Sequence, residues 1–269
     1  MIQFKISIFI IIIAFAVKAY GQEDTRSSLF WNNLSIYNPA ETGGLGKDST
    51  LSHYFSTNGQ ISSLAPDSSS MRSFNMLYEI KITSKNGIGI NYQQDKVGFK
   101  INNQVNLNYS HSMHVGKGYL SAGIGTGYAS NNFFNLNGGL MYTTNRLRTG
   151  IGITHINHSK YEPLKYNFSK TQNYYLSYQY SFITKSLMFT PMVFIRSIMS
   201  HTNMDIGILA HWNKFIFVGI GYRTDKTILY SAGVSIKKIL LTYAYNYEKP
   251  NVSVLNNSSH EVGLKIRLK

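Results

Sequence analysis

A run of alternating residues between Lys214 and Tyr247 constrains the fold more than any other part of the chain. Apolar or aromatic residues fill every second position of Ile216–Tyr222, Ile228–Ile236 and Ile239–Tyr247, and most intervening residues are small or polar. This period of two predicts three consecutive β-strands, because successive side chains of a strand point to opposite faces. Charged residues gather at the strand ends. An apolar outer face, a small and polar inner face and tyrosines near the ends are typical of a transmembrane β-barrel.

The composition favours the same fold over a soluble one. Charged residues make up 14% of the 269 residues, against roughly 25% in ordinary soluble domains. A soluble β-sandwich that acts as a binding module would need a charged exterior, which this sequence does not supply. After the N-terminus, no apolar run approaches the roughly 20 residues of a membrane helix. A membrane location therefore predicts a barrel.

Residues 1–21 have the pattern of a secretory signal peptide. Lys5 supplies the positive start, an apolar run follows, and Ala19 and Gly21 provide small residues before the expected cleavage site. A single membrane anchor is the alternative, but the apolar run is short and Lys18 interrupts its end. Export combined with a barrel predicts the outer membrane of a bacterium with two membranes.

The charge and the cysteine content exclude several classes of function. The net charge is +14, and there is no cysteine. A basic chain raises the possibility of nucleic-acid binding. Here the basic residues are scattered singly or in pairs at expected turns, where they cannot follow a phosphate backbone, so we expect no nucleic-acid partner. The lack of cysteine excludes disulfides and thiolate zinc sites.

Alternation and turn residues together predict an all-β, antiparallel transmembrane barrel of about fourteen strands over residues 45–269. The expected strands are 48–57, 71–83, 87–94, 101–115, 119–130, 135–144, 146–156, 172–183, 186–197, 203–213, 215–223, 227–236, 239–248 and 259–268. Short turns alternate with longer links, which are expected at 58–70, 95–100, 131–134, 157–171, 198–202, 224–226 and 249–258. Outer-membrane barrels have short periplasmic turns and longer external loops, so an even strand number places both termini in the periplasm.

Residues 22–44 are expected to form a periplasmic plug or cap that precedes the barrel. The segment contains aromatic side chains that would be costly to leave in water, and an Asn-Pro pair typical of turns. It can serve either as a surface that binds partners or as a plug that fills the barrel, and the sequence leaves both open. The candidate residues are Phe30, Trp31, Tyr37, Asn38, Pro39 and Gly43.

Charged residues within the expected strands predict a network in the barrel lumen. The acidic candidates are Glu79, Asp205 and Glu261, and the basic candidates are Lys81, Arg146, Arg148, Lys265 and Arg267. Such charges in a barrel usually hold the wall together. No nucleophile and base stand in a catalytic pattern, so we expect no catalytic residues and no enzyme.

No metal or cofactor site is expected either. His111 and His114 are three residues apart, which places them on opposite faces of a strand, where they cannot share a metal. Gly123, Gly125 and Gly127 lack the following helix that a dinucleotide fingerprint requires. These glycines are expected to face the lumen, where small residues suit a crowded interior.

Four stretches, taken in order, resemble the PorP/SprF family of outer-membrane proteins of the Bacteroidetes type IX secretion system. They are LFWNNLSIYNPAETG (Leu29–Gly43), GIGINYQQDKVG (Gly87–Gly98), NLNYSHSMHVGKGYLSAGIGTG (Asn106–Gly127) and NSSHEVGLKIRLK (Asn257–Lys269). The last stretch departs from the family, whose members tend to end on an aromatic residue.

The resemblance implies a non-enzymatic barrel that supports secretion or surface anchoring of cargo proteins, such as gliding adhesins with a C-terminal secretion domain. It also implies the periplasmic ring lipoproteins of the secretion machinery as partners. The alternative is an outer-membrane diffusion channel or a transporter of hydrophobic solutes, since a small and polar inner face suits either role.

Overall fold

A computed structural model describes residues 27–44, 53–62, 72–97, 100–129, 133–157, 173–198, 201–248 and 258–268. The expected signal peptide, residues 1–21, lies outside this part. No helix within it is long and apolar enough to cross a membrane.

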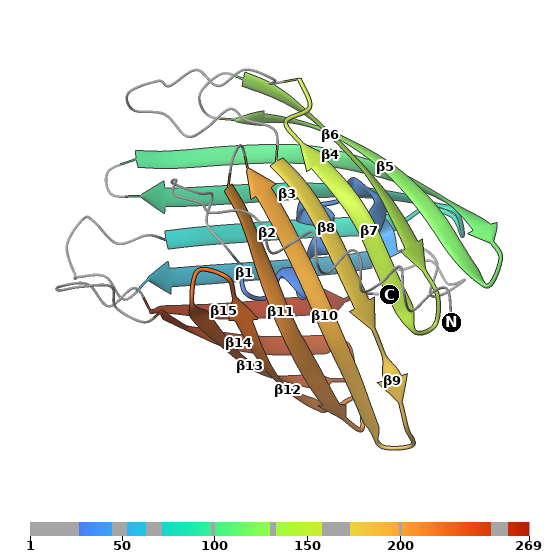
Figure 1. Cartoon of the computed structure of the whole chain (residues 1–269). Helices are drawn as coiled ribbons and strands as arrows, with labels where there is room; N and C mark the ends of the chain where they lie inside the picture. Colours follow the sequence, from blue (N-terminus) through green and yellow to red (C-terminus); the bar gives the residue numbers. More distant parts are fainter. Residues whose placement is uncertain are drawn as a thin grey trace.

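The strands form one closed antiparallel barrel of 14 strands (Figure 1). Their bounds are β1 (His53–Ser62), β2 (Arg72–Lys81), β3 (Asn86–Val97), β4 (Lys100–Val115), β5 (Gly118–Ala129), β6 (Phe133–Thr143), β7 (Leu147–Thr154), β8 (Asn173–Tyr180), β9 (Phe182–Ile183), β10 (Leu187–Ile198), β11 (His201–Trp212), β12 (Ile216–Arg223), β13 (Thr227–Ile236), β14 (Ile239–Glu248) and β15 (Ser259–Arg267). The short β9 continues β8 beyond a break at Ser181, since both pair with β10. The fold class predicted from alternation is confirmed.

The barrel closes between the first and last strands. β15 pairs with β14 on one side and with β1 on the other, in a register that runs from Tyr54–Arg267 to Ser62–Ser259. β10 and β11 complete the circle. Among the described strands, every strand except the two-residue β9 pairs on both sides, so closure removes the long open edge that is the usual template for aggregation.

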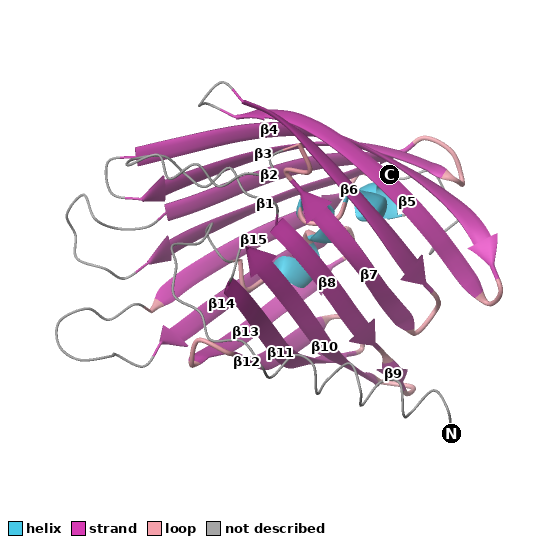
Figure 2. Ribbon diagram, turned by 45° about the horizontal axis from the view of Figure 1, so that its top comes forward, coloured by secondary structure: helices cyan, strands magenta, loops and turns pink. Residues whose placement is uncertain are grey.

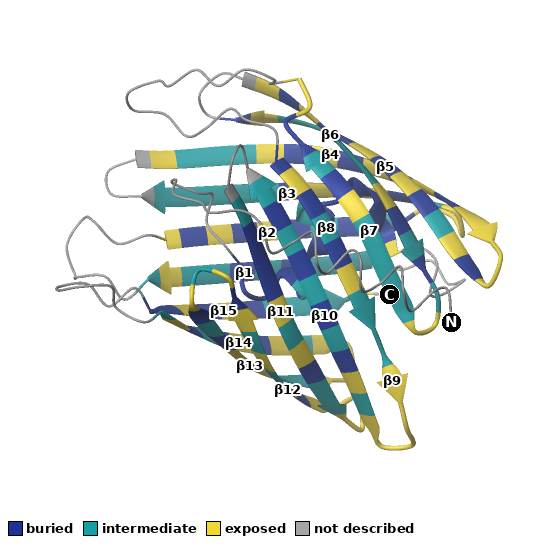
Figure 3. Ribbon diagram, in the orientation of Figure 1, coloured by how far each residue is buried: buried dark blue, intermediate teal, exposed yellow. Residues whose placement is uncertain are grey.

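The two faces of the wall differ as the alternation predicts. Leu107, Ile124 and Leu241 point outward and are 54%, 68% and 49% exposed, whereas Asn106 and Asn108 point into the lumen and are buried. Figure 3 shows the resulting alternation of buried and exposed residues along the strands. The apolar outer surface fits a lipid environment, and the inner wall is lined by amides, hydroxyls and glycines.

The first strand departs from its expected bounds of 48–57. β1 runs from His53 to Ser62, because Asn58-Gly59 does not form a turn. Asn-Gly is a strong turn signal, yet Asn58 and Gly59 pair with Gly263 and Val262 in the ladder. The side chain of Asn58 instead donates a hydrogen bond to Glu261 in the lumen.

Two of the longer links expected from the sequence are much shorter in the structure. β3 extends to Val97 and β4 begins at Lys100, so strand residues take up most of the expected 95–100 link. Likewise, β10 ends at Ile198 and β11 begins at His201, within the expected 198–202 link. Polar residues in these stretches continue the ladder, so the alternation of short and long connections is weaker than predicted.

Residues 27–44 lie inside the barrel, where Figure 2 shows their short helices within the ring of strands. They form three short 3₁₀ helices, η1 (Phe30–Asn32), η2 (Leu34–Ile36) and η3 (Pro39–Gly44). We call residues 27–44 the inner segment. Most of its residues are buried against the inner wall, so a single continuous piece of chain occupies this part of the lumen.

Ile124→Arg is expected to lower the free energy of unfolding by about 2–4 kcal/mol, because it places a charge on the lipid face in the middle of β5. Denaturant unfolding in lipid vesicles measures the change. Val115→Arg is the matched control, since Val115 is also exposed but lies beside the turn that ends β4. Val115→Arg should lower the free energy of unfolding by only about 0–1 kcal/mol, because it lies near the membrane interface. Equal losses at the two positions would contradict the assignment of the lipid face.

Candidate functional site

Aromatic rings attach the start of the inner segment to the barrel wall. Phe30 stacks on Phe194 with ring centroids 4.4 Å apart, and Trp31 meets Phe217 edge to face at 5.1 Å. Tyr37 meets Phe194 edge to face, with ring centroids 5.2 Å apart. Desolvation inside the barrel raises the pKa of Tyr37 to about 12. These contacts form an apolar cluster within an otherwise polar lumen.

The second half of the inner segment packs against glycines on the inner face of the barrel wall. A Cβ at Gly123 would overlap the backbone of Pro39 and Ala40, and a Cβ at Gly152 would overlap the carbonyl of Tyr37. A Cβ at Gly87 on β3 would overlap the Thr42 carbonyl, and a Cβ at Gly139 on β6 would overlap the Asn38 side chain. We call this set the glycine wall, and its members are Gly87, Gly123, Gly139 and Gly152. Only residues without a side chain leave room for the inner segment at these positions.

Hydrogen bonds fix the inner segment where it lies on the glycine wall. The Asn38 amide donates to the carbonyl of Leu140 at 3.0 Å, and its oxygen accepts from the Ala40 N–H at 3.0 Å. Ser110 donates to the Thr42 carbonyl at 2.7 Å. Gly43, with φ of 77°, then turns the chain in a conformation that favours glycine. The Asn38-Pro39 pair and Gly43 thus set the path of the backbone.

The carboxylate of Glu261 on β15 holds the first residues of the inner segment. It accepts hydrogen bonds from the Ser27 hydroxyl at 2.5 Å, the Ser28 N–H at 2.7 Å and the Leu29 N–H at 3.3 Å. Asn58 on β1 donates to it as well, at 3.2 Å. Glu261 therefore links the inner segment to both strands of the barrel's closing seam.

Two further charged side chains contact the inner segment. The guanidinium of Arg148 on β7 forms a two-bond ion pair with Glu41, in which Nε donates to Oε1 at 2.8 Å and a terminal nitrogen donates to Oε2. Lys265 on β15 donates to the Asn32 carbonyl at 2.8 Å. The inner segment is therefore tied to opposite parts of the wall by charge as well as by packing.

A separate buried ion cluster lies on β10, β11 and β12. Asp205 accepts from Arg196 at 2.9 Å and from Arg223 at 2.7 Å and 3.1 Å. All three side chains are nearly inaccessible to solvent. Because a buried carboxylate is stable only when paired, the two guanidinium groups make this cluster possible.

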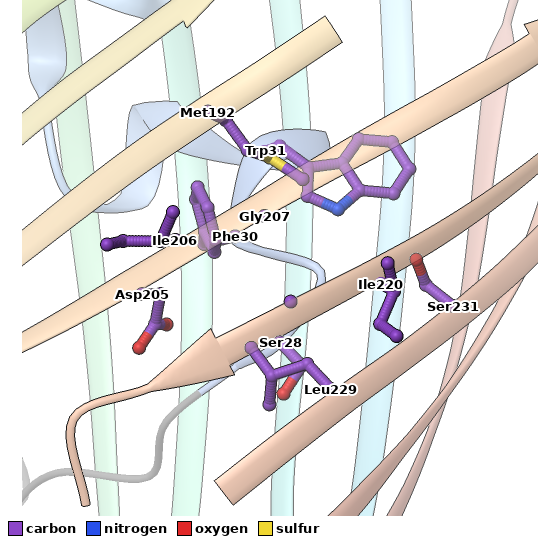
Figure 4. A pocket seen from close by; sticks show the side chains of 11 residues that line it. Ser28, Phe30, Trp31, Met192, Asp205, Ile206, Gly207, Ile220, Leu229 and Ser231 are labelled. Carbon is purple, nitrogen blue, oxygen red and sulfur yellow. The ribbon is translucent and has the colours of Figure 1, made fainter. Parts of the chain in front are cut away.

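Asp205 also borders a small cavity between the inner segment and the wall (Figure 4). Phe30 and Trp31 line one side of it, and Leu229 and Ser231 of β13 line the other. Its volume of about 20 Å³ is room for a single water molecule. The inner segment therefore packs closely against this part of the wall.

The structure separates the predicted lumen charges into different groups. Glu79 and Lys81 on β2 are buried in the lumen, and Arg267 on β15 lies 6.0 Å from the ring of Tyr54. Arg146 was expected to point inward, but this is wrong. It is exposed in the turn before β7, because that strand begins at Leu147.

Sequence reasoning missed three members of these charge groups. Glu41 precedes the barrel and lies 107 positions from Arg148, so no local pattern connects them. The sequence pattern places Arg223 at a strand end, and it assigns no role to Arg196 within the expected strand 186–197. Their alternation with outward apolar neighbours could have placed both in the lumen with Asp205.

The comparisons with known proteins agree with this architecture. The family model described as "Type IX secretion system membrane protein PorP/SprF" matches residues 19–137 and 128–266. No curated protein matches the chain. Among solved structures, Omp33 of Acinetobacter baumannii superposes with a TM-score of 0.54 at 8% identity, covering 81% of this chain and 99% of that one. A bacterial polysaccharide outer membrane secretin gives a TM-score of 0.48 at 11% identity, covering 81% and 98%.

The likeness to Omp33 shows the barrel fold alone, whereas the family match spans the inner segment and nearly the whole wall. The matched residues include the glycine wall, the Glu41–Arg148 pair and Glu261. The chain is an outer-membrane β-barrel and belongs to the PorP/SprF family of type IX secretion system membrane proteins.

Proposed function

We propose that this barrel acts without catalysis to support secretion or surface anchoring of cargo proteins by the type IX system. The inner segment would form its partner site. The observation that carries the proposal is that residues 27–44, within the matched family region, occupy the lumen through both packing and charge. A diffusion channel would need that space open to solute, so the closely packed inner segment favours the secretion role over the channel alternative.

The partners in this proposal are the secretion machinery, including its periplasmic ring lipoproteins, and cargo that carries a C-terminal secretion domain. The end of the barrel with short turns would face them. The chain enters β1 and leaves β15 at this end, because the Leu268 N–H donates to the His53 carbonyl at 2.9 Å and the Arg267 N–H donates to the Lys238 carbonyl at 2.8 Å. Short turns are periplasmic in bacterial barrels, so both termini would lie in the periplasm.

Deleting residues 24–40 behind the intact N-terminal leader is expected to leave a barrel that inserts but no longer supports cargo secretion. Heat-modifiable gel mobility measures insertion, and cargo in the culture medium or on the cell surface measures secretion. Replacing the same residues with a Gly/Ser linker of equal length controls for chain length. Failed insertion would assign the segment a structural role only, and normal secretion would overturn the proposed partner site.

A further inference from the structure

Every short turn at one end of the barrel carries a basic residue. In an antiparallel barrel, the connections β2–β3, β4–β5, β6–β7, β9–β10, β11–β12 and β13–β14 all lie at the same end. None of them contains an acidic residue. Their basic residues, all exposed, form what we call the basic rim, which consists of Lys85, Lys117, Arg146, Lys185, Lys214, Lys237 and Lys238.

The acidic residues that the structure describes are found elsewhere. Some lie in the lumen, namely Glu41, Glu79, Asp205 and Glu261. The others lie at or next to the opposite end, namely Asp95, Asp225 and Glu248. The described part of the chain shows no ion pair with a rim residue. The positive charge of the rim is thus not cancelled by the described carboxylates of the barrel.

Backbone hydrogen bonds hold the rim turns in fixed positions relative to neighbouring strands. The Lys85 carbonyl accepts from the Ser112 N–H at 2.7 Å, and the Arg146 carbonyl accepts from the Ser181 N–H at 2.7 Å. The turn that contains Lys214 is tied directly to the turn before it, because the Asn213 N–H donates to the Ser186 carbonyl at 2.7 Å. The basic side chains therefore extend from turns whose backbones are fixed to one another around this end of the barrel.

Two rim lysines occupy backbone conformations that ordinary side chains avoid. Lys214 has φ of 57° and Lys237 has φ of 54°. Glycine or asparagine adopts this left-handed region more easily than lysine does. Lys226, in the turn between β12 and β13 at the opposite end, has φ of 75°, so this conformation is not confined to the rim.

Exposed apolar side chains stand directly beside the basic residues. Trp212 and Phe215 flank Lys214 and are 58% and 48% exposed, and Phe182 lies close to Lys185 in sequence at the end of the same strand pair. Aromatic rings beside lysines are typical of the boundary between hydrocarbon and headgroups. Turns this short do not extend far beyond that boundary, so their cations lie at the level of the lipid phosphates.

We propose that the basic rim binds the headgroups of anionic phospholipids in the membrane leaflet that it faces. Each lysine at a membrane surface attracts anionic lipid by electrostatics, while its carbon chain lies along the apolar wall. The rim would thereby fix the depth of the barrel and collect a belt of anionic lipid around one end. This inference concerns a surface outside the inner segment and does not depend on the proposed partner site.

Trp212 offers a direct test, because Trp31 in the lumen is the other of the two tryptophans in the chain. The full-length protein with Trp31→Phe is placed in vesicles that mix phosphatidylcholine with phosphatidylglycerol, one of which is dibrominated. Brominated chains quench a nearby tryptophan. We expect brominated phosphatidylglycerol to bind near Trp212 about fivefold to thirtyfold more strongly than brominated phosphatidylcholine, as one or both of Lys214 and Lys185 would give.

Lys185→Gln combined with Lys214→Gln should reduce this preference to about one. Two matched pairs should keep it, namely Lys85→Gln with Lys117→Gln on the opposite side of the rim, and Arg72→Gln with Lys226→Gln at the other end. Heat-modifiable mobility verifies that each variant is folded. Equal quenching by the two lipids in the parent protein would overturn the proposal. The proposal would also be overturned if the rim residues were needed to bind an acidic protein while the two lipids quenched Trp212 equally.

Discussion

Asp205→Asn is expected to lower the free energy of unfolding by about 3–5 kcal/mol, because it leaves two buried guanidinium groups without a carboxylate. Arg196 and Arg223 both donate to Asp205, and the side chains of all three are at most 6% exposed. Surface ion pairs contribute far less, since water screens them. Denaturant unfolding of the vesicle-reconstituted barrel measures the loss.

Asp225→Asn is the matched control for this prediction. Asp225 lies in the turn that follows Arg223 and accepts the Thr227 N–H at 3.0 Å, a bond that an asparagine oxygen can also accept. Its replacement should change stability by less than about 1 kcal/mol. Adding Arg223→Gln to Asp205→Asn should recover part of the loss by removing one unpaired charge. An unchanged stability in Asp205→Asn would mean that water reaches this cluster.

Gly123→Val is expected to displace the inner segment from the glycine wall and to raise the conductance of the barrel above that of the parent protein. A side chain at this position would overlap the backbone of Pro39 and Ala40, which cannot rotate away as a flexible side chain could. If the strands of the glycine wall shift and the inner segment stays in place, overpacking should lower the free energy of unfolding by about 1–3 kcal/mol. Planar-bilayer recordings measure conductance, and limited proteolysis measures exposure of the segment.

Gly59→Val on β1 makes the same chemical change at a glycine with open space around it. It should leave both conductance and proteolysis unchanged. A Gly123→Val barrel with the conductance, protease protection and stability of the parent would contradict the assigned contact between the inner segment and the wall.

Alternation was sufficient to predict most strands, because each strand has one face in lipid and one in the lumen. It placed β13 and β14 at their observed bounds. It failed where local signals conflict with long-range pairing. Asn58-Gly59 is a sequence typical of turns, but its pairing with β15 holds it in β1. Arg146 is two positions before Arg148 and would share its face in a continued strand, but it lies before β7 begins.

The contacts of the inner segment could not be predicted from the sequence for a different reason. Ser27 and Glu261 are 234 positions apart, and their hydrogen bond exists only after the barrel has closed. The aromatic residues and the Asn38-Pro39 pair predicted that this segment needs a surface. Nothing in the sequence identified the glycines of β3, β5, β6 and β7 as that surface, because inward glycines also suit a strongly curved strand.

The position of Glu261 and Lys265 on the last strand has a consequence for the order of assembly. The first residues that the structure describes find their binding groups on β15, which follows the other strands in the chain and also joins β14 to β1. During insertion, the N-terminus must therefore remain unbound by these groups until the C-terminal strand has entered the sheet. A chain cut short before β15 would lose both the closing seam and this attachment of the inner segment.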